Sequence, residues 1–507
     1  MDRGIARQAR KVVVIGAGPA GLTAAYELCK IGLPSVVLEK DTVVGGLART
    51  VHYNGYHFDI GGHRFFTKVK RVEDMWHEVL PGGQFLRRPR LSRIYYKKRF
   101  FYYPLRPVNA LLGLGIGNTL AVVLSYIKAQ FTPALPEETF DQWVSNRFGR
   151  RLFEIFFKTY TEKVWGIPCN EILAEWAAQR IRGLSLFSAI KSALLPQSNR
   201  SPMTIIKTLV DEFDYPERGP GMLWERVAEI VQGRGAEVRL GARVERILWD
   251  GDGVRAVETS VDGRIERVEG THFISSMPIR ELIQRLDPPP DARVLEAAMN
   301  LHYRDFLAVA VIIDKPHLFP DNWIYIHDPD VRVARIQNFK NWSPHMVPDG
   351  RKTCLGLEYF CFEGDDLWTM SDAALTALAR REVETLGLAR AADVEDGAVV
   401  RMPKAYPVYD APYPAALQEI RSFLDRLENL QLIGRSGLHK YNNQDHSMLT
   451  AMLAVENLLG ASFDIWAVNQ EQEYHEAAPG RDSAAEDAAR LASTQPRVPV
   501  RKSPGPK

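Results

Sequence analysis

Residues 11–40 read KVVVIGAGPAGLTAAYELCKIGLPSVVLEK: a β-branched run, a glycine-rich turn, a helical pattern and a second β-branched run. In the turn, Gly16 permits a tight reversal and Gly18 lets a pyrophosphate approach the backbone, while Gly21 lets the helix pack closely on the strand. The helix N-terminus faces the anion, and Glu39, at the end of the second strand, can accept hydrogen bonds from ribose hydroxyls. This succession predicts a Rossmann-like α/β unit that binds a dinucleotide.

The residues after Glu39 indicate which dinucleotide is bound. Residues 45–49 read GGLAR, and a Gly-Gly pair followed by a small residue and Arg resembles the second pyrophosphate loop of the amine-oxidase-like FAD proteins. The resemblance implies that Gly46, Leu47 and Arg49 contact the cofactor. An acidic residue at the end of the second strand also disfavours the 2′-phosphate of NADP. The sequence therefore predicts FAD as the cofactor.

The remaining cofactor contacts are expected far along the chain. Residues 430–433 form a short apolar strand, after which Gly434 and Arg435 lead into a helix. In FAD proteins of this class such a helix begins under the flavin pyrimidine, where its dipole stabilises negative charge. A strand over 241–248 is expected to meet the adenine, and 273–278 to lead back to the flavin. The cofactor contacts implied in these segments and in one earlier turn are Val244, Gly434, Arg435, Asp445, Ser447, Met448 and Gly62.

Five further segments resemble the UDP-galactopyranose mutase family, in the family's order along the chain. Residues 159–166, TYTEKVWG, resemble its YTEKxWG signature, and residues 61–67, GGHRFFT, resemble a segment near its flavin. Residues 332–342, RVARIQNFKNW, resemble the segment whose Arg holds the substrate diphosphate. Residues 405–410, AYPVYD, resemble its Tyr-Pro-Val-Asn-Asp segment, and residues 434–445 resemble a block at the flavin. The matches extend over most of the chain.

The resemblance implies a redox-neutral reaction in which N5 of the reduced flavin is the nucleophile. A nucleoside-diphosphate sugar would change between its pyranose and furanose forms. Arg335 and Tyr406 would hold the diphosphate, because a planar guanidinium bonds two oxygens at once and a phenol adds a neutral donor. His63 would lie at the flavin and is a candidate for proton transfer. The flavin would be needed in its reduced state, with NADPH as one candidate external reductant.

Several positions depart from the family pattern on the substrate side. Phe66 stands where the family has a second His, and Leu184 stands near the position of a family Arg. For Trp165, stacking on a nucleotide base and filling a domain interface are both open. A second function class also stays open: a flavin-dependent oxidase, dehydrogenase or desaturase acting on a sugar, amine or lipid-linked substrate. The candidates for substrate binding are Tyr160, Trp165, Arg180, Arg182, Tyr441 and Asn442.

The composition is that of an ordinary globular protein, with 46% hydrophobic and 25% charged residues among 507. A formal net charge of only +2 gives no support for nucleic-acid binding. The four cysteines form no CxxC pair, which argues against a zinc site and a disulfide framework, and no metal is expected. The N-terminus lacks an apolar signal segment, so a cytoplasmic location is expected. The oligomeric state stays open.

Residues 108–127, VNALLGLGIGNTLAVVLSYI, pass without a charge. A run of this length can span a bilayer, but three glycines and two asparagines dilute it and globular sequence follows at once. A buried helix beside the active site is the favoured interpretation. Shallow, peripheral membrane association is the alternative, and a transmembrane span comes third.

The FAD-binding domain is predicted to be discontinuous, because its motifs lie far apart in the chain. Its three parts are 1–69, 215–290 and 425–470. Of the two insertions, 70–214 reads as mainly helical, and the alternating strands of 291–424 suggest an antiparallel sheet over the flavin. Residues 471–507, rich in Ala, Pro, Ser and charge, are expected to form a disordered tail.

Overall fold

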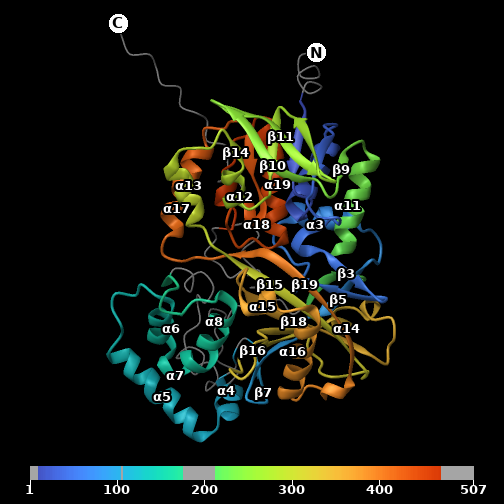
Figure 1. Ribbon diagram of the computed structural model, residues 1–507. Helices are drawn as coiled ribbons and strands as arrows, with labels where there is room; N and C mark the ends of the chain where they lie inside the picture. Colours follow the sequence, from blue (N-terminus) through green and yellow to red (C-terminus); the bar gives the residue numbers. More distant parts are fainter. Residues whose placement is uncertain (1–9, 104, 106, 175–211, 470–507) are drawn as a thin grey trace.

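The structure is a computed structural model that describes residues 10–103, 105, 107–174 and 212–469. Figure 1 shows three parts of the molecule: a parallel sheet with its helices at the top, a large, mainly antiparallel sheet below it, and a group of helices at the lower left. Segments from both ends of the chain meet in the upper part, where the first strand and the helix near residue 450 lie together.

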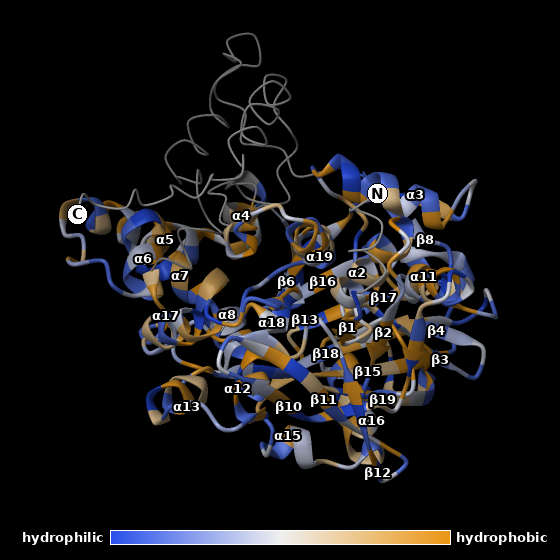
Figure 2. Cartoon of the chain, turned by 90° about the horizontal axis from the view of Figure 1, so that it is seen from above, coloured by the Kyte–Doolittle hydropathy of each residue, from blue (hydrophilic) through white to orange (hydrophobic). Residues whose placement is uncertain are grey.

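A five-stranded parallel sheet forms the centre of the upper part, in the order β20-β13-β1-β2-β9. All four residues of β1 are buried, as expected for a Val/Ile run in a parallel sheet covered on both faces. Figure 2 shows β1 and β2 as part of this hydrophobic centre. Because the strands come from separated segments, the predicted α/β class with a discontinuous Rossmann-like unit is confirmed. The strands are β1 (Val12–Ile15), β2 (Ser35–Leu38), β9 (Glu237–Arg239), β13 (His272–Ser275) and β20 (Leu430–Leu432).

Helices pack against this sheet and against one another. α2 (Pro19–Lys30) packs against both α19 (Gln444–Leu458) and α11 (Gly221–Gly233). A second, four-stranded sheet in the order β12-β11-β10-β14 adjoins this core. Further elements of the upper part are β3 (Thr50–Tyr53), β4 (Tyr56–Asp59), β10 (Arg243–Asp250), β11 (Gly253–Val261), β12 (Arg264–Glu269), β14 (Leu286–Asp287), α12 (Ile279–Gln284) and α18 (Gly434–Gly437).

Three helices that the sequence assigns to the insertions belong to the core of the upper part. α13 (Ala292–Met299) and α17 (Tyr413–Leu424) pack against each other, and their buried faces join the hydrophobic cluster that contains β1. α3 (Lys70–Val79) joins the same cluster. The insertions are therefore shorter than the predicted 70–214 and 291–424. Periodicity marks an apolar helix face but does not say which core will bury it.

The large sheet has seven strands in the order β19-β15-β18-β17-β16-β6-β7. Neighbouring strands pair antiparallel except β16 and β6, which pair parallel. β15 and β18 are buried along their whole length. The elements are β15 (Tyr303–Ile313), β16 (Trp323–Ile326), β17 (Arg335–Asn338), β18 (Thr353–Cys361), β19 (Val394–Pro407), α14 (Phe339–Trp342), α15 (Asp366–Thr369) and α16 (Asp372–Thr385).

The interval 70–214, predicted to be mainly helical, contributes two strands to this sheet. β6 (Ser92–Tyr96) and β7 (Arg99–Tyr102) form a hairpin at its edge, while β5 (Phe85–Pro89) pairs with β8 (Glu212–Pro216). The reason is local: Ile, Tyr and Phe are strand-forming residues, and here they face one another across the hairpin. The composition of this stretch therefore outweighs the helical character of its neighbours.

The helical group contains the uncharged run 108–127, which is not one buried helix. It is split at Gly115, whose φ of +78° ends one helix and starts the next. Ile116 is 91% exposed and Phe131 is 82% exposed, because α6 and α7 cover only one side of α5. The favoured interpretation of a buried helix is therefore wrong. The helices are α4 (Pro107–Leu114), α5 (Ile116–Phe131), α6 (Phe140–Phe148), α7 (Arg150–Phe153) and α8 (Thr159–Trp165), with a π-helical turn over Glu154–Lys158.

Within the described ranges, no helix has both the length and the apolar character needed to cross a membrane. Across the same ranges, no group of His, Cys, Asp or Glu side chains is placed to hold a metal ion. All four cysteines are free thiols.

A buried carboxyl group that ties β4 to β8 generates a prediction about pH. Asp59 is 2% exposed and accepts hydrogen bonds from Thr50 (2.8 Å) and from the hydroxyl of Tyr215. Burial raises the pKa of Asp59 to about 7, against the two hydrogen bonds that lower it. The folded protein then keeps a proton that the unfolded chain releases near pH 4, so this carboxyl makes stability fall as pH rises from about 4 to about 7.

We expect Asp59→Asn to remove this contribution. Between about pH 5 and pH 7.5, the melting temperature of the variant should fall by several degrees less than that of the parent. Thermal denaturation followed by circular dichroism at both pH values measures the difference. Parallel pH profiles for parent and variant would contradict the prediction.

Candidate functional site

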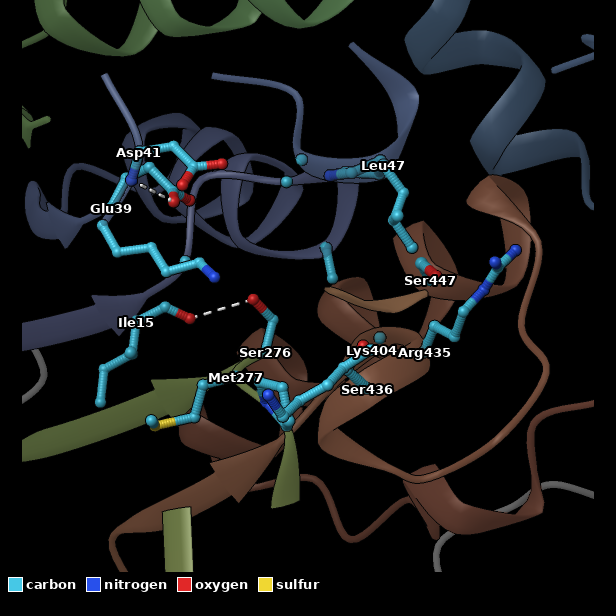
Figure 3. A pocket seen from close by; sticks show the side chains of 18 of the residues that line it. Ile15, Glu39, Asp41, Leu47, Ser276, Met277, Lys404, Arg435, Ser436 and Ser447 are labelled. Atoms are coloured by element: carbon cyan, nitrogen blue, oxygen red, sulfur yellow. Dashed lines mark hydrogen bonds between the residues drawn. The ribbon is translucent and has the colours of Figure 1, made fainter. Parts of the chain in front are cut away.

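A cavity of about 320 Å³ opens where the separated segments of the upper part meet. It lies between the turn after β1, the loop at residues 46–49, the end of β13 and the start of α19. Figure 3 shows side chains from all of these segments around it, among them Glu39, Leu47, Ser276 and Ser447. Ten of the fourteen cofactor residues predicted from the sequence line the cavity: Gly16, Gly18, Glu39, Gly46, Leu47, Arg49, Val244, Gly434, Arg435 and Ser447.

Two glycine turns form the narrow end of the cavity. Gly16 has a φ of +99°, and a Cβ there would stand 2.3 Å from the hydroxyl of Ser276. Gly46 has a φ of +52°, and a Cβ there would stand 3.2 Å from the Cα of Gly18. The N–H of Gly45, beside it, donates to the carbonyl of Ala17 at 2.9 Å. The two backbones thus make a cradle without side chains, which is what a pyrophosphate needs to approach main-chain N–H groups.

Glu39 holds the first turn in shape. Its two carboxylate oxygens accept the N–H groups of Ala17 (2.7 Å) and Asp41 (2.9 Å), and its side chain is buried. Burial raises the pKa of Glu39, although these two hydrogen bonds act in the opposite direction. Each carboxylate oxygen keeps a second lone pair, so Glu39 can still accept a ribose hydroxyl from a bound cofactor.

The charges around the cavity suit an anionic ligand. Five of the cations form ion pairs with carboxylates, two of them with lining residues at 2.8 Å (Arg49 to Asp41) and 3.2 Å (Lys404 to Glu281). The N-terminus of α19 also meets the cavity and adds positive potential. Cations therefore outnumber carboxylates, and the site fits FAD in charge as well as in backbone shape. The cations are Lys40, Arg49, Arg243, Arg285, Arg401, Lys404 and Arg435; the carboxylates are Glu39, Asp41 and Glu281.

Four predicted cofactor residues lie outside the lining: Gly21, Gly62, Asp445 and Met448. Gly21 has a packing role, because a Cβ there would stand 1.8 Å from the carbonyl oxygen of Gly16. Gly62 faces β17 and α14. Met448 is fully buried and its sulfur accepts a hydrogen bond from the indole of Trp76 at 3.1 Å. Asp445 is 2% exposed. A direct cofactor contact for these four stays a prediction.

One wall of the cavity was not predicted from the sequence. It is the turn of β19 at residues 401–404. Lys404 adopts a φ of +55°, and its N–H donates to Asp305 at 2.6 Å. This left-handed residue turns the strand toward the cofactor cavity. No composition or spacing signal marks a Lys for this conformation, since Gly and Asn are the residues that favour it.

A second group of predicted residues gathers beside the cavity, on the face of the large sheet. Arg335 on β17 donates from Nε to Glu358 on β18 at 2.5 Å, and Gln337 donates to the other oxygen of Glu358 at 2.7 Å. Glu358 is 1% exposed, so its charge is satisfied by these two partners. The pairing holds the Arg335 guanidinium in one orientation next to the segment at Gly61.

Tyrosine side chains gather near this guanidinium, and Tyr160 and Tyr406 interact with it electrostatically. Tyr406 and Tyr441 stack with ring centroids 5.5 Å apart, and the guanidinium of Arg435 lies 5.2 Å and 4.9 Å from their centroids. Tyr160 from α8 stacks on His327 at 4.9 Å. Burial raises the pKa of Tyr406 to about 12 and that of Tyr160 well above its usual range. These hydroxyls therefore stay protonated and can donate hydrogen bonds at neutral pH.

His63 lines the cofactor cavity, on the side facing this tyrosine group. Its Nε2 lies 3.0 Å from the carbonyl of Ile60, which can only accept, so Nε2 carries the proton. Burial lowers the pKa of His63 to about 4, and the nearby guanidinium groups of Arg435 and Arg335 lower it further. The imidazole is therefore neutral at pH 7. A proton-transfer role stays a prediction.

The other predicted substrate residues are placed differently. Trp165, at the end of α8, is 5% exposed, and its ring centroid lies 6.4 Å from that of Tyr409 and 6.5 Å from that of Tyr441. This packing favours the interpretation in which Trp165 fills an interface. Asn442 lines the cofactor cavity and donates to the carbonyl of Gly434 at 3.0 Å, which places it with the cofactor residues. Arg180 and Arg182 lie outside the described residues.

The signature stretch 159–166 forms α8 and its C-terminal turn, and two cations, Lys163 within it and Arg304 outside it, make structural contacts there. Arg304 donates to the carbonyls of Val164 (3.1 Å) and Phe360 (2.9 Å), so a cation caps the helix where its carbonyls lack partners. Lys163 donates to the carbonyl of Asp328 at 2.6 Å, and burial lowers the pKa of Lys163 to about 8. Both contacts clamp the helical group to the large sheet and so position Tyr160.

The cofactor cradle predicts a selective effect at Gly18. Its backbone is extended (φ −81°), and a Cβ there would make only an ordinary 3.8 Å contact with Gly46. We expect Gly18→Ala to leave the melting temperature of the apoprotein unchanged but to weaken FAD binding by about tenfold or more, because the methyl group occupies the pyrophosphate path. Fluorescence titration of apoprotein with FAD measures the affinity. Gly233→Ala, in open space on α11, is the matched control. Unchanged FAD affinity in Gly18→Ala would show that the backbone at Gly18 does not bind the pyrophosphate.

The clamp on α8 predicts a loss of stability at Gly166. Its φ is +70°, and a Cβ there would stand 2.3 Å from the guanidinium carbon of Arg304. We expect Gly166→Ala to destabilise the protein by about 2 kcal/mol or more, seen as a lower melting temperature. Gly117→Ala on α5, where no atom lies within 4 Å, should be neutral or slightly stabilising. Equal melting temperatures for the two variants would show that the clamp does not constrain this turn.

Comparisons with known proteins agree with this geometry. The model of the flavin containing amine oxidoreductase family matches residues 19–443. In structure, the chain is similar to reduced UDP-galactopyranose mutase, with a TM-score of 0.76 and 22% identity over 92% of this chain and 98% of that one. At this identity the likeness shows the fold alone.

The curated relatives by sequence include desaturases. The lycopene-forming phytoene desaturase of Pseudescherichia vulneris is 27% identical over 50% of this chain and 54% of its own. The 4,4′-diapophytoene desaturase of Staphylococcus haemolyticus is 23% identical over 60% of this chain and 66% of its own. The chain therefore spans between about half and two thirds of the length of these relatives. The family match covers most of the chain and specifies the flavin that the cavity fits, so the chain belongs to the family of flavin-containing amine oxidoreductases.

Proposed function

We propose that this flavoenzyme interconverts the pyranose and furanose forms of a nucleoside-diphosphate sugar. The observation that carries the proposal is the convergence of Arg335, Tyr160, Tyr406 and Tyr441 beside the cofactor cavity. They come from three distant parts of the chain, and Arg435 borders the same group. The charges of both Arg335 and Arg435 act on Tyr406, which places two guanidinium groups around one phenol. Such an arrangement suits a substrate diphosphate.

When bound, the reduced flavin supplies the nucleophile that this chemistry requires. The chain's own residues bind and orient the substrate. Glu358 takes the Nε and Nη2 edge of Arg335, so the Nη1 side is the one that can bind a substrate oxygen. The raised pKa values of Tyr160 and Tyr406 keep two neutral donors, which can hold a diphosphate without binding the leaving group too tightly. Neutral His63 is a candidate for proton transfer.

A second candidate is a flavin-dependent oxidoreductase. Two observations favour it: the sequence relatives include desaturases and oxidases, and Glu358 already balances the charge of Arg335. A balanced guanidinium attracts an anionic substrate less strongly than a bare one. The two candidates differ in a measurable way. An oxidoreductase leaves its flavin reduced after one substrate oxidation, whereas a mutase returns it in the state in which it began.

The diphosphate role of Arg335 is tested by substitution. Arg335→Ala alone would leave Glu358 buried without its partner, which costs roughly 3 to 5 kcal/mol. We therefore choose Arg335→Gln/Glu358→Gln, which keeps neutral hydrogen-bonding groups at both positions. The double variant should retain its flavin but bind nucleotide sugars about tenfold to a hundredfold more weakly, with a matching loss of isomerisation. Calorimetric titration and product analysis under anaerobic reducing conditions measure both effects.

The matched control is Arg332→Ala. Arg332 lies three residues away, is 41% exposed at its side chain and pairs with Asp366 at the surface. It should leave flavin content, binding and turnover unchanged. If the double variant binds nucleotide sugars as tightly as the parent, Arg335 does not hold the diphosphate.

A further inference from the structure

α4 and α5 present an apolar face to the outside of the molecule. The exposed fractions are 59% for Leu120, 58% for Leu124 and 46% for Ile127. The large exposed side chains recur at spacings of three and four along α5, so they form one stripe on one side of the helix. Its members are Ile116, Leu120, Val123, Leu124, Ile127 and Phe131. Leu112 on α4 and Leu135 beyond α5 are exposed on either side of the stripe in the sequence.

The opposite side of α5 holds the helix to the protein. Ser125 accepts the N–H of Arg151 at 3.0 Å, and Gln130 donates to the carbonyl of Asn146 at 3.2 Å. Val122 is buried against α6 and α7. The packing contacts and the apolar stripe therefore occupy different sides of one helix. In Figure 1, α5 runs along the outer edge at the lower left, away from the dinucleotide-binding part.

Basic residues border the stripe. Residues 94–136 contain five Lys and Arg, and the first acidic residues after them are Glu137 and Glu138. Lys97, Lys98 and Arg99 form the exposed turn between β6 and β7, and Arg99 donates to the carbonyl of Gly113 at 3.0 Å, which places this turn beside the junction of α4 and α5. Lys128 is exposed next to the stripe on α5. An apolar helix face bordered by cations is the pattern of helices that lie in the interface of an anionic membrane.

We propose that the outward face of α4 and α5 docks on the surface of an anionic lipid bilayer. α5 would lie in the plane of the membrane, with the stripe among the acyl chains and the Lys97–Arg99 turn and Lys128 at the lipid phosphates. A second copy of the chain is a poorer occupant. A two-fold contact through this face would bring the basic border of one copy against that of the other.

The docking face is continuous with the substrate side of the site. One hydrophobic cluster contains Val122 of α5 and Trp165 of α8, and Tyr406 and Tyr441 pack against it. A bilayer bound at the stripe would therefore support the same group of helices that positions Tyr160. The inference does not depend on the proposed reaction, since vesicle binding can be measured without turnover.

The test is flotation of the full-length protein with vesicles. Two compositions are used: phosphatidylcholine alone, and phosphatidylcholine with about one third phosphatidylglycerol. The parent should float with the anionic vesicles and be released as salt rises. Leu120→Glu/Leu124→Glu should reduce its partitioning by about tenfold or more. Lys97→Asn/Lys98→Asn, in which Asn suits the left-handed backbone of both positions, should weaken binding to anionic vesicles alone.

Ile265→Glu is the matched control, because Ile265 is 57% exposed on β12, in the dinucleotide-binding part. It makes the same chemical change and should bind vesicles like the parent. Circular dichroism and flavin content verify that each variant is folded. The proposal is overturned if the parent does not float with anionic vesicles, or if Leu120→Glu/Leu124→Glu floats as well as the parent. Sedimentation velocity tests a second copy of the chain as the alternative occupant. The proposal is also overturned if the parent is a dimer that binds no vesicle and Leu120→Glu/Leu124→Glu is a monomer.

Discussion

The close approach of two glycine turns is the constraint on which the rest of the site depends. The backbone after β1 and the loop at residues 45–49 are joined by the hydrogen bond from Gly45 to Ala17, and a Cβ on Gly46 would press against Gly18. Main-chain N–H groups can reach a pyrophosphate there only because no side chain intervenes. A pyrophosphate held there would set where a bound flavin lies relative to α19, to His63 and to the large sheet.

Local signals made this half of the protein predictable from its sequence. The turn, the helix, the second strand and Glu39 follow one another within thirty residues, and ten predicted cofactor residues line the cavity. The boundaries of the insertions were harder to predict from the sequence, because α3, α13 and α17 could have buried their apolar faces in any of several cores. The β6–β7 hairpin was missed for a related reason. Its Ile, Tyr and Phe residues favour strands locally, but the helical patterns of the neighbouring segments hid that signal, and its other partner β16 lies more than two hundred residues away.

The substrate side shows how a signature can be informative without being catalytic throughout. In the stretch 159–166, Lys163 binds carbonyls of the large sheet and Gly166 makes room for Arg304, so both preserve the docking of α8. Tyr160 is the member that this docking brings toward Arg335 and Tyr406. Sequence resemblance marks all of these residues alike. The contacts separate the residues that hold α8 in place from the one that lies near Arg335.

The central claim is that the flavin acts here without net redox change. The most direct measurement is proton NMR of an anaerobic sample of dithionite-reduced protein with a panel of nucleotide sugars, with the flavin absorbance recorded on the same sample. The account predicts that the furanose isomer of one sugar accumulates to equilibrium while the flavin stays reduced. It would be contradicted if no isomer formed and the oxidised protein instead bleached in proportion to the substrate consumed.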